Sequence, residues 1–395
     1  MFPRLRHGLA VLLLLPTLAA CDPGGLVAPV ATPVVAPTPL PTATPEPPPA
    51  AATPTVLTPD TIQADLQTVV DTERRAVLGK SQDAFMNVID HGDRDWYKFE
   101  EDEFANDSYL TERLDCVSNI RIGPNGATAQ ADVALDSCPG RYKVGMFFRL
   151  VAGHWLHSQP GLDEQGPRAT KKIGPFRVTY HEMEDPYLAT LAHFAPAVYE
   201  RVSSVLNMKQ LDVDVDLLSR PTDMPRGAFT TIALYNPINA RMSMLSPRFW
   251  PNGDGTEEAL GDQVRTTLTH EFTHHAVRTA ALLHVPHWFN EGMAVYISQE
   301  NPTRYVRDNQ QLALSGKLQP PEALNALLQD GDAAEISYAE GYGFVHYLTA
   351  KQGDTVLAPL LLALNESGDL NAALKTVTGK GLSPWWQAWT ASLKE

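Results

Sequence analysis

Two histidines four residues apart most constrain what this chain can fold into. His270 and His274 have the spacing of residues that lie above one another on the same face of an α-helix. Apolar residues recur at helical spacing in the same segment, at Val264, Leu268 and Phe272. We therefore expect a helix with an apolar face over about Gly261–Leu283, with both imidazole rings directed at one point.

The glutamate between these histidines indicates that the pair belongs to a catalytic metal site. Glu271 follows His270 directly, so its carboxylate approaches the same point from the side. Two imidazoles and a carboxylate ligand suit Zn²⁺, which leaves one position open for water. Glu271 would then act as a general base toward that water instead of binding the ion. The spacing predicts a zinc site with its own catalytic base.

Such a site needs a third ligand. The metzincin pattern requires glycine and histidine where this chain has Val277 and Ala280, so that class is excluded. Glu291 lies on the next expected helix, His287–Gln299. His284 and His287 are alternative ligands from the residues alone.

Two segments resemble a known peptidase family. Residues 270–274 (His-Glu-Phe-Thr-His) and 286–294 (Pro-His-Trp-Phe-Asn-Glu-Gly-Met-Ala) are similar to gluzincins of the MA clan. The likeness is greatest to the bacterial peptidase MA-like group related to aminopeptidase N. In that family Trp-x-x-Glu-Gly-x-Ala carries the third zinc ligand, which matches Glu291. The resemblance covers roughly 174–395 and implies a zinc metallopeptidase acting on a peptide or protein substrate.

The same families carry a Tyr-x-x-Gly segment that opens a later helix. Its tyrosine hydrogen-bonds the tetrahedral intermediate, and the matching residue here is Tyr338, with Tyr342 as the alternative. The segment that holds a substrate's free amino end in true aminopeptidases has no clear counterpart. Gly227 to Thr231 lies where such an edge strand is expected, but without its glutamate. An aminopeptidase specificity is therefore not supported, although an edge strand can hold extended peptide by main-chain pairing.

The N-terminus has the pattern of an export signal. Residues 1–20 combine arginines, a short apolar run and Leu-Ala-Ala before Cys21, which resembles the bacterial lipoprotein cleavage box. The resemblance implies lipidation of Cys21 and anchoring to the extracytoplasmic face of the cell membrane. The alternative is an ordinary secretion signal. Residues 21–59 are rich in Pro, Ala and Thr and predict an extended stalk.

Charge and the remaining cysteines fit an exported protein. The net charge is −15 and no basic run is present, which disfavours nucleic acid as a partner. Apart from Cys21, the chain has only Cys116 and Cys138. Two cysteines in an exported chain most simply form one disulfide, with two buried free thiols as the alternative.

Between the stalk and the motif, residues 60–165 predict a small α+β domain. Helices over Thr61–Val77 and Ser81–Asp90 precede runs with strand character: Arg113–Ile122, Ala127–Leu135, Tyr142–Val151 and His154–Ser158. Helices followed by a meandering sheet resemble the cone-shaped fold of the nuclear transport factor and SnoaL-like families. His154 and His157, near a strand end, are interpreted as structural.

A second unit, residues 174–395, is expected to be a small sheet followed by helices. Strands are expected at Phe176–Tyr180, Leu211–Leu218 and Phe229–Tyr235 around a helix over Asp185–Leu206. Beyond the two motif helices we expect four more before the C-terminal helix, over Pro320–Leu328, Tyr338–Lys351, Thr355–Leu364 and Leu370–Val377, and then Pro384–Leu393. The fold class is therefore α+β, with a thermolysin-like zincin domain as its second part.

A hypothesis of another class remains beside the enzyme. The peptidase fold, or the small cone-like domain, could serve a surface protein that binds a ligand without catalysis. The intact Glu271 argues against this, because a degenerate site commonly loses its catalytic carboxylate first.

Overall fold

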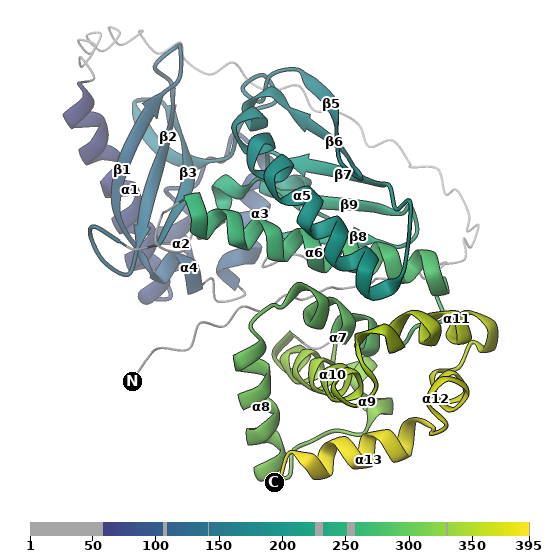
Figure 1. The fold of residues 1–395 in the computed structure, drawn as a ribbon. Helices are drawn as coiled ribbons and strands as arrows, with labels where there is room; N and C mark the ends of the chain where they lie inside the picture. The colour runs from purple at the N-terminus through teal and green to yellow at the C-terminus, as the bar shows by residue number, and fades with distance from the viewer. Residues whose placement is uncertain are drawn as a thin grey trace, which may run out of the picture.

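The computed structural model describes most of the chain beyond the expected stalk. Its described residues are 58–105, 109–140, 142–225, 232–250, 257–328 and 331–394. The expected signal peptide, Cys21, nearly all of the expected stalk and the segment 227–231 lie outside them. Among the helices of the described part, none has both the length and the apolar character needed to cross a membrane. The α+β fold class is confirmed, with two small sheets followed by a mostly helical part (Figure 1).

The first unit is a four-stranded antiparallel meander with helices at its start. Strands β1 to β4 are neighbours in sequence order. One face of the sheet packs on α1, whose buried stripe includes Ile62, Leu66 and Val69. Cys116 of β1 and Cys138 beyond β2 form a disulfide, with their Cα atoms 5.6 Å apart. The likeness to a cone-shaped fold stays a prediction. The elements are α1 Pro59–Leu78, α2 Gln82–Met86, α3 Arg94–Ala105, α4 Tyr109–Glu112, β1 Leu114–Ile122, β2 Thr128–Leu135, β3 Tyr142–Val151 and β4 His154–Ser158.

Helix α3 was not expected from the sequence. Its segment is rich in charge, which hides the helical spacing of its apolar residues. The start is nevertheless marked by a capping aspartate, since the Asp93 carboxylate accepts from the N–H groups of Asp95 and Trp96. Trp96 then anchors the helix by packing into the core and donating its indole N–H to the His157 carbonyl.

The second sheet is mixed and has five strands in the order β5-β6-β7-β9-β8. The central strands run parallel, whereas β8 runs antiparallel to β9 at one edge. Strand β5 was not expected; it lies between the two predicted units and pairs with β6. The elements are β5 Arg168–Ile173, β6 Phe176–His181, α5 Asp185–Leu206, β7 Val213–Leu218, β8 Ala233–Asn236 and β9 Arg241–Leu245.

The remaining chain is helical and packs below this sheet (Figure 1). Helix α8 was missed because most of its residues are polar, but Tyr305, Asn309 and Ala313 form a buried stripe four residues apart. Helix α10 begins earlier than predicted, so Tyr338 lies inside the helix and does not open it. The elements are α6 Glu257–Ala281, α7 His287–Ser298, α8 Pro302–Leu314, α9 Pro321–Leu327, α10 Gly331–Gln352, α11 Leu357–Ser367, α12 Leu370–Thr378 and α13 Leu382–Ser392.

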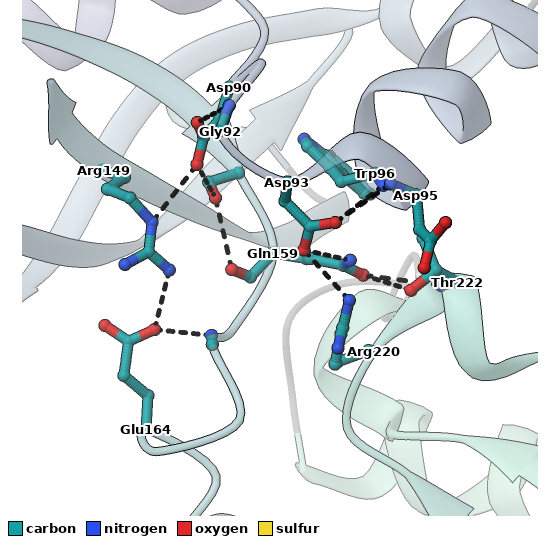
Figure 2. Close-up of polar contacts among 12 residues, drawn as sticks. Asp90, Gly92, Asp93, Asp95, Trp96, Arg149, Gln159, Glu164, Arg220 and Thr222 are labelled. Atoms are coloured by element: carbon teal, nitrogen blue, oxygen red, sulfur yellow. Dashed lines mark hydrogen bonds and ion pairs between the residues drawn. The ribbon is translucent and has the colours of Figure 1, made fainter.

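A polar network joins the first unit to the second, as Figure 2 shows. Asp93 at the start of α3 accepts from Arg220 at 3.0 Å and from the amide of Gln159 at 2.9 Å. The Gln159 oxygen in turn accepts from the Thr222 hydroxyl at 2.9 Å. Arg220 and Thr222 follow β7 in the second unit, and the chain then runs toward β8. The small unit is therefore fixed to the segment that precedes the edge strand.

Candidate metal centre

Two helices bring together the three residues predicted to bind metal. Helix α6 presents His270 and His274 one turn apart, and α7 presents Glu291 opposite them. The Nε2 atoms of His270 and His274 lie 3.3 and 3.4 Å from the same Glu291 oxygen, Oε2. All three side chains are buried, and in the described part of the chain this is the one cluster suited to a metal ion.

The spacing of these atoms fits a tetrahedral ion. Ligand bonds of about 2.0–2.1 Å place neighbouring tetrahedral ligands about 3.3 Å apart. The observed separations of 3.3 and 3.4 Å match that edge length. Within the described residues, none of the three converging atoms makes a hydrogen bond of proper geometry, although all are buried. Buried polar atoms without partners are costly, and a metal ion between them would satisfy all three.

The carboxylate of Glu291 is held in its charged form. Burial alone would raise the pKa of this carboxyl, but His274, His270 and His287 together hold it well below its usual range. His287 lies 3.1 Å from Oε1, the oxygen that does not face the other histidines. His287, one of the two alternative ligands considered from the sequence, therefore contacts the carboxylate of Glu291. His284 is not part of the cluster.

A second carboxylate orients His270 from behind. Glu300 Oε2 lies 3.0 Å from Nδ1 of His270, which leaves Nε2 to face the cluster. A carboxylate on the far nitrogen fixes the tautomer and ring orientation of a metal-binding histidine. Glu300 was not predicted from the sequence, because it follows α7 and lies outside the matched motif. The only indication of such a residue was the general rule that a metal-binding histidine has a hydrogen-bond partner on its other ring nitrogen.

The predicted base Glu271 lies beside the cluster and faces the edge strand. Its Oε2 accepts a hydrogen bond of 2.7 Å from the main-chain N–H of Tyr235 in β8. Burial raises the pKa of the Glu271 carboxyl above its usual value. The neighbouring His275 is directed elsewhere, with Nδ1 3.3 Å from the Tyr235 hydroxyl. Tyr235 thus connects β8 to α6 through both its main chain and its side chain.

The two candidate tyrosines on α10 have different surroundings. The Tyr338 hydroxyl is buried and has no hydrogen-bond partner among the described residues. Burial and then the charge of Glu291 raise the pKa of Tyr338 well above its usual value. Tyr342 stacks on His346, and burial alone raises the pKa of its phenol. Of the two, Tyr338 is the one whose hydroxyl is influenced by the cluster.

Helices α7 and α10 approach closely next to the third ligand. A methyl group added at Gly292 would lie 2.4 Å from the Gly341 carbonyl oxygen, and one at Gly341 would lie 2.6 Å from the Trp288 oxygen. This contact brings the helix of Tyr338 against that of Glu291.

A pocket of about 140 Å³ opens directly beside the cluster. Glu271, His274 and Glu291 form part of its lining, and the edge strand contributes Leu234 and Tyr235. The predicted base and two of the three clustered residues therefore face a space that a small molecule or a side chain can enter.

The C-terminal part of the chain is similar to a known superfamily. Residues 255–395 match the model of the Peptidase MA superfamily. No curated protein matches the chain. The matched segment runs from α6 to the C-terminus and includes His270, His274 and Glu291. The chain therefore carries a domain like those of MA-clan peptidases, whereas both sheets lie outside the match.

Proposed function

We propose that this protein is a zinc-dependent peptidase of the gluzincin type. His270, His274 and Glu291 would hold the ion, which, when bound, acts as a Lewis acid toward a peptide carbonyl and acidifies water. The observation that carries the proposal is the position of Glu271. Its carboxylate lies beside three converging atoms that have no hydrogen-bond partner among the described residues, and it faces the same pocket.

The side chains around the cluster supply the remaining functions of a peptidase. Glu271 would take a proton from water at its carboxylate and pass it to the leaving amine. Tyr338, with its buried hydroxyl unpartnered in the described structure, would donate to the oxygen that becomes negative as the carbonyl is attacked. The pocket wall and the packed helices would limit the access of bulk water.

Strand β8 is suited to hold an extended substrate. The Leu245 N–H donates to the Ile232 carbonyl at 2.8 Å, so Ile232 and Leu234 direct their main-chain groups toward β9. Because main-chain direction alternates along a strand, Ala233 and Tyr235 direct their main-chain groups to the other side of β8, where the described part of the chain has no further strand. Tyr235 donates there to Glu271, which places a peptide paired along this edge next to the base.

Metal content and chelator-sensitive cleavage test this proposal. We expect purified protein to contain about one zinc per chain and to cleave members of a peptide library, with cleavage lost in chelator and restored by zinc. Glu291→Ala should lose the metal, whereas Glu271→Gln should retain it and lose cleavage. Wild-type protein without zinc, or full cleavage by Glu271→Gln, would contradict the proposal. In the first case a non-catalytic binding role would gain support.

We also propose that the enzyme is anchored outside the cytoplasm by lipid on Cys21. The support is the sequence of residues 1–21, an export signal ending at a lipoprotein-like cleavage box. Expressed in a bacterium, the full chain should fractionate with membranes and incorporate labelled fatty acid. Cys21→Ser should abolish both. Unlabelled, freely soluble wild-type protein would indicate an ordinary secretion signal.

A further inference from the structure

We propose that the pocket beside Glu271 selects a bulky apolar side chain next to the cleaved bond, presented by an extended, unfolded segment. This inference rests on the proposed peptidase function and adds a substrate class to it. It predicts discrimination against small, acidic and basic side chains at that position.

The wall of the pocket is aliphatic and comes from three parts of the fold. Leu234 belongs to the edge strand, Val277 to α6, and Leu282, Leu283 and Val285 to the connection between α6 and α7. The pocket also contains Glu271 and His274. A substrate residue whose side chain fills this space therefore has its main chain at the base and the cluster.

The rim of the pocket is apolar as well. Leu282 and Leu283 are 52% and 70% exposed, and Ile238, next to the lining residue Pro237, is 84% exposed. Exposed apolar residues gathered at the mouth of a site indicate contact with an apolar partner. Arg278 ties the two sides of this rim together, since its Nε donates to the Pro237 carbonyl at 3.2 Å. An apolar residue of the substrate can thus continue its contacts outside the pocket.

The lining carries charges of both signs, so a charged substrate side chain meets a like charge. Among the described residues of the lining, Arg278 is the cationic side chain besides the histidines, and Glu271 and Glu291 are the carboxylates. A substrate lysine or arginine would be desolvated beside Arg278, and an acidic side chain beside the two glutamates, which is unfavourable in both cases. Small side chains would leave the aliphatic wall unfilled. One methylene in such a pocket changes kcat/KM by about 10–200-fold, so leucine or phenylalanine should exceed alanine by at least about tenfold.

The experiment compares the wild type with variants, all full-length and loaded with zinc. Each protein is given the same library of unstructured peptides, in which every amino acid is presented at each position around the cleaved bond. Wild type should cleave next to leucine, phenylalanine or methionine, at least about tenfold faster than next to alanine, and least next to acidic and basic residues. Leu283→Lys should shift the preference toward acidic residues, and Leu283→Glu toward basic ones. Both shifts should shrink in about 1 M salt, which screens exposed charges.

A matched control separates the pocket from a general effect of surface charge. Leu162 is also 70% exposed but does not line the pocket. Leu162→Lys and Leu162→Glu should leave the preference unchanged, and all four variants should bind zinc and unfold at the wild-type temperature. Zinc-dependent cleavage without an apolar preference, or equal effects at both leucines, would overturn this inference and leave the peptidase standing. If no peptide is cleaved at all, the proposed peptidase fails and the inference falls with it.

Discussion

Glu300 Oε2 lies 3.0 Å from Nδ1 of His270, on the opposite side of the imidazole ring from Glu291. The ring is therefore held between two carboxylates, one at each nitrogen. The inner contact belongs to the candidate metal cluster, and the outer one fixes which nitrogen faces it. This arrangement makes Glu300 a positioning residue whose contribution can be measured without turnover.

We predict that Glu300→Gln weakens zinc binding by about 10–100-fold, the usual effect of losing such an outer partner. An amide can still accept a hydrogen bond but no longer carries the charge that increases the basicity of the ring. Competition with a chromophoric chelator measures the affinity directly. Glu366→Gln, an exposed change on α11, is the control and should bind zinc as wild type does. Equal affinities of Glu300→Gln and wild type would show that His270 needs no such support.

Removal of the Tyr338 hydroxyl should slow catalysis without releasing metal. Loss of one donor to a developing oxyanion commonly lowers kcat by about 10²–10³-fold, so Tyr338→Phe should show that loss with zinc content unchanged. Tyr342→Phe is the matched control, because it removes the same group one helical turn away, where the ring stacks on His346. Steady-state kinetics of both variants on one efficiently cleaved peptide show which tyrosine contributes to kcat. A larger loss at Tyr342 would reverse the assignment.

Sequence patterns could predict the parts of this site that depend on local spacing. His270, His274 and Glu291 are recognised because ligands on two successive helices leave a readable motif. Glu300 and Tyr235 were missed for a physical reason. Glu300 reaches the site from the end of α7, and Tyr235 contributes a main-chain N–H that any residue type could supply. The sequence does not specify such tertiary contacts.

The secondary structure was likewise predicted well where the local sequence pattern is strong and missed where it is weak. Strands with clean alternation and helices with apolar stripes were predicted close to their observed ends, as for β7 and α5. Helices α3 and α8 were missed, because their charged faces dilute the periodic signal that their few buried residues provide. Strand β5 was missed because five of its six residues are exposed and it is ordered by pairing with β6.

The contact between Gly292 and Gly341 should tolerate no added methyl group. Gly292→Ala would place Cβ 2.4 Å from a main-chain oxygen, so α7 and α10 must separate. Overpacking in a core usually costs about 1–3 kcal/mol, and contact with rigid backbone places this change at the upper end. The separation also moves Glu291 relative to Tyr338. We expect a lower unfolding temperature together with weaker zinc binding. Wild-type values for both would show that the helices shift without affecting the site.

Stability should also depend on pH through a buried carboxyl in the small unit. Glu100 of α3 is enclosed near Glu73 of α1 and His157 of β4, with Glu103 on its own helix. Burial, with the repulsion of Glu73, raises the pKa of Glu100 from 4.5 to about 7 despite the opposing effect of His157. The folded chain therefore retains a proton that the unfolded chain has released. Its contribution to stability is complete below pH 4.5 and is lost as pH rises toward 7.

We predict that Glu100→Gln, which keeps the neutral shape, flattens this dependence. Wild type should lose on the order of 3 kcal/mol from this group between pH 4.5 and 7, since each pKa unit corresponds to about 1.4 kcal/mol. Urea unfolding at pH 5 and pH 8 measures, for wild type and for Glu100→Gln, how the free energy of unfolding changes with pH. Burial also raises the pKa of Glu103, to about 8, so the variant should keep a smaller slope of the same sign. Glu101→Gln, on the exposed side of α3, should unfold like wild type at both pH values. If Glu100→Gln and wild type show the same loss of stability between pH 5 and pH 8, Glu100 is already ionised in the folded protein.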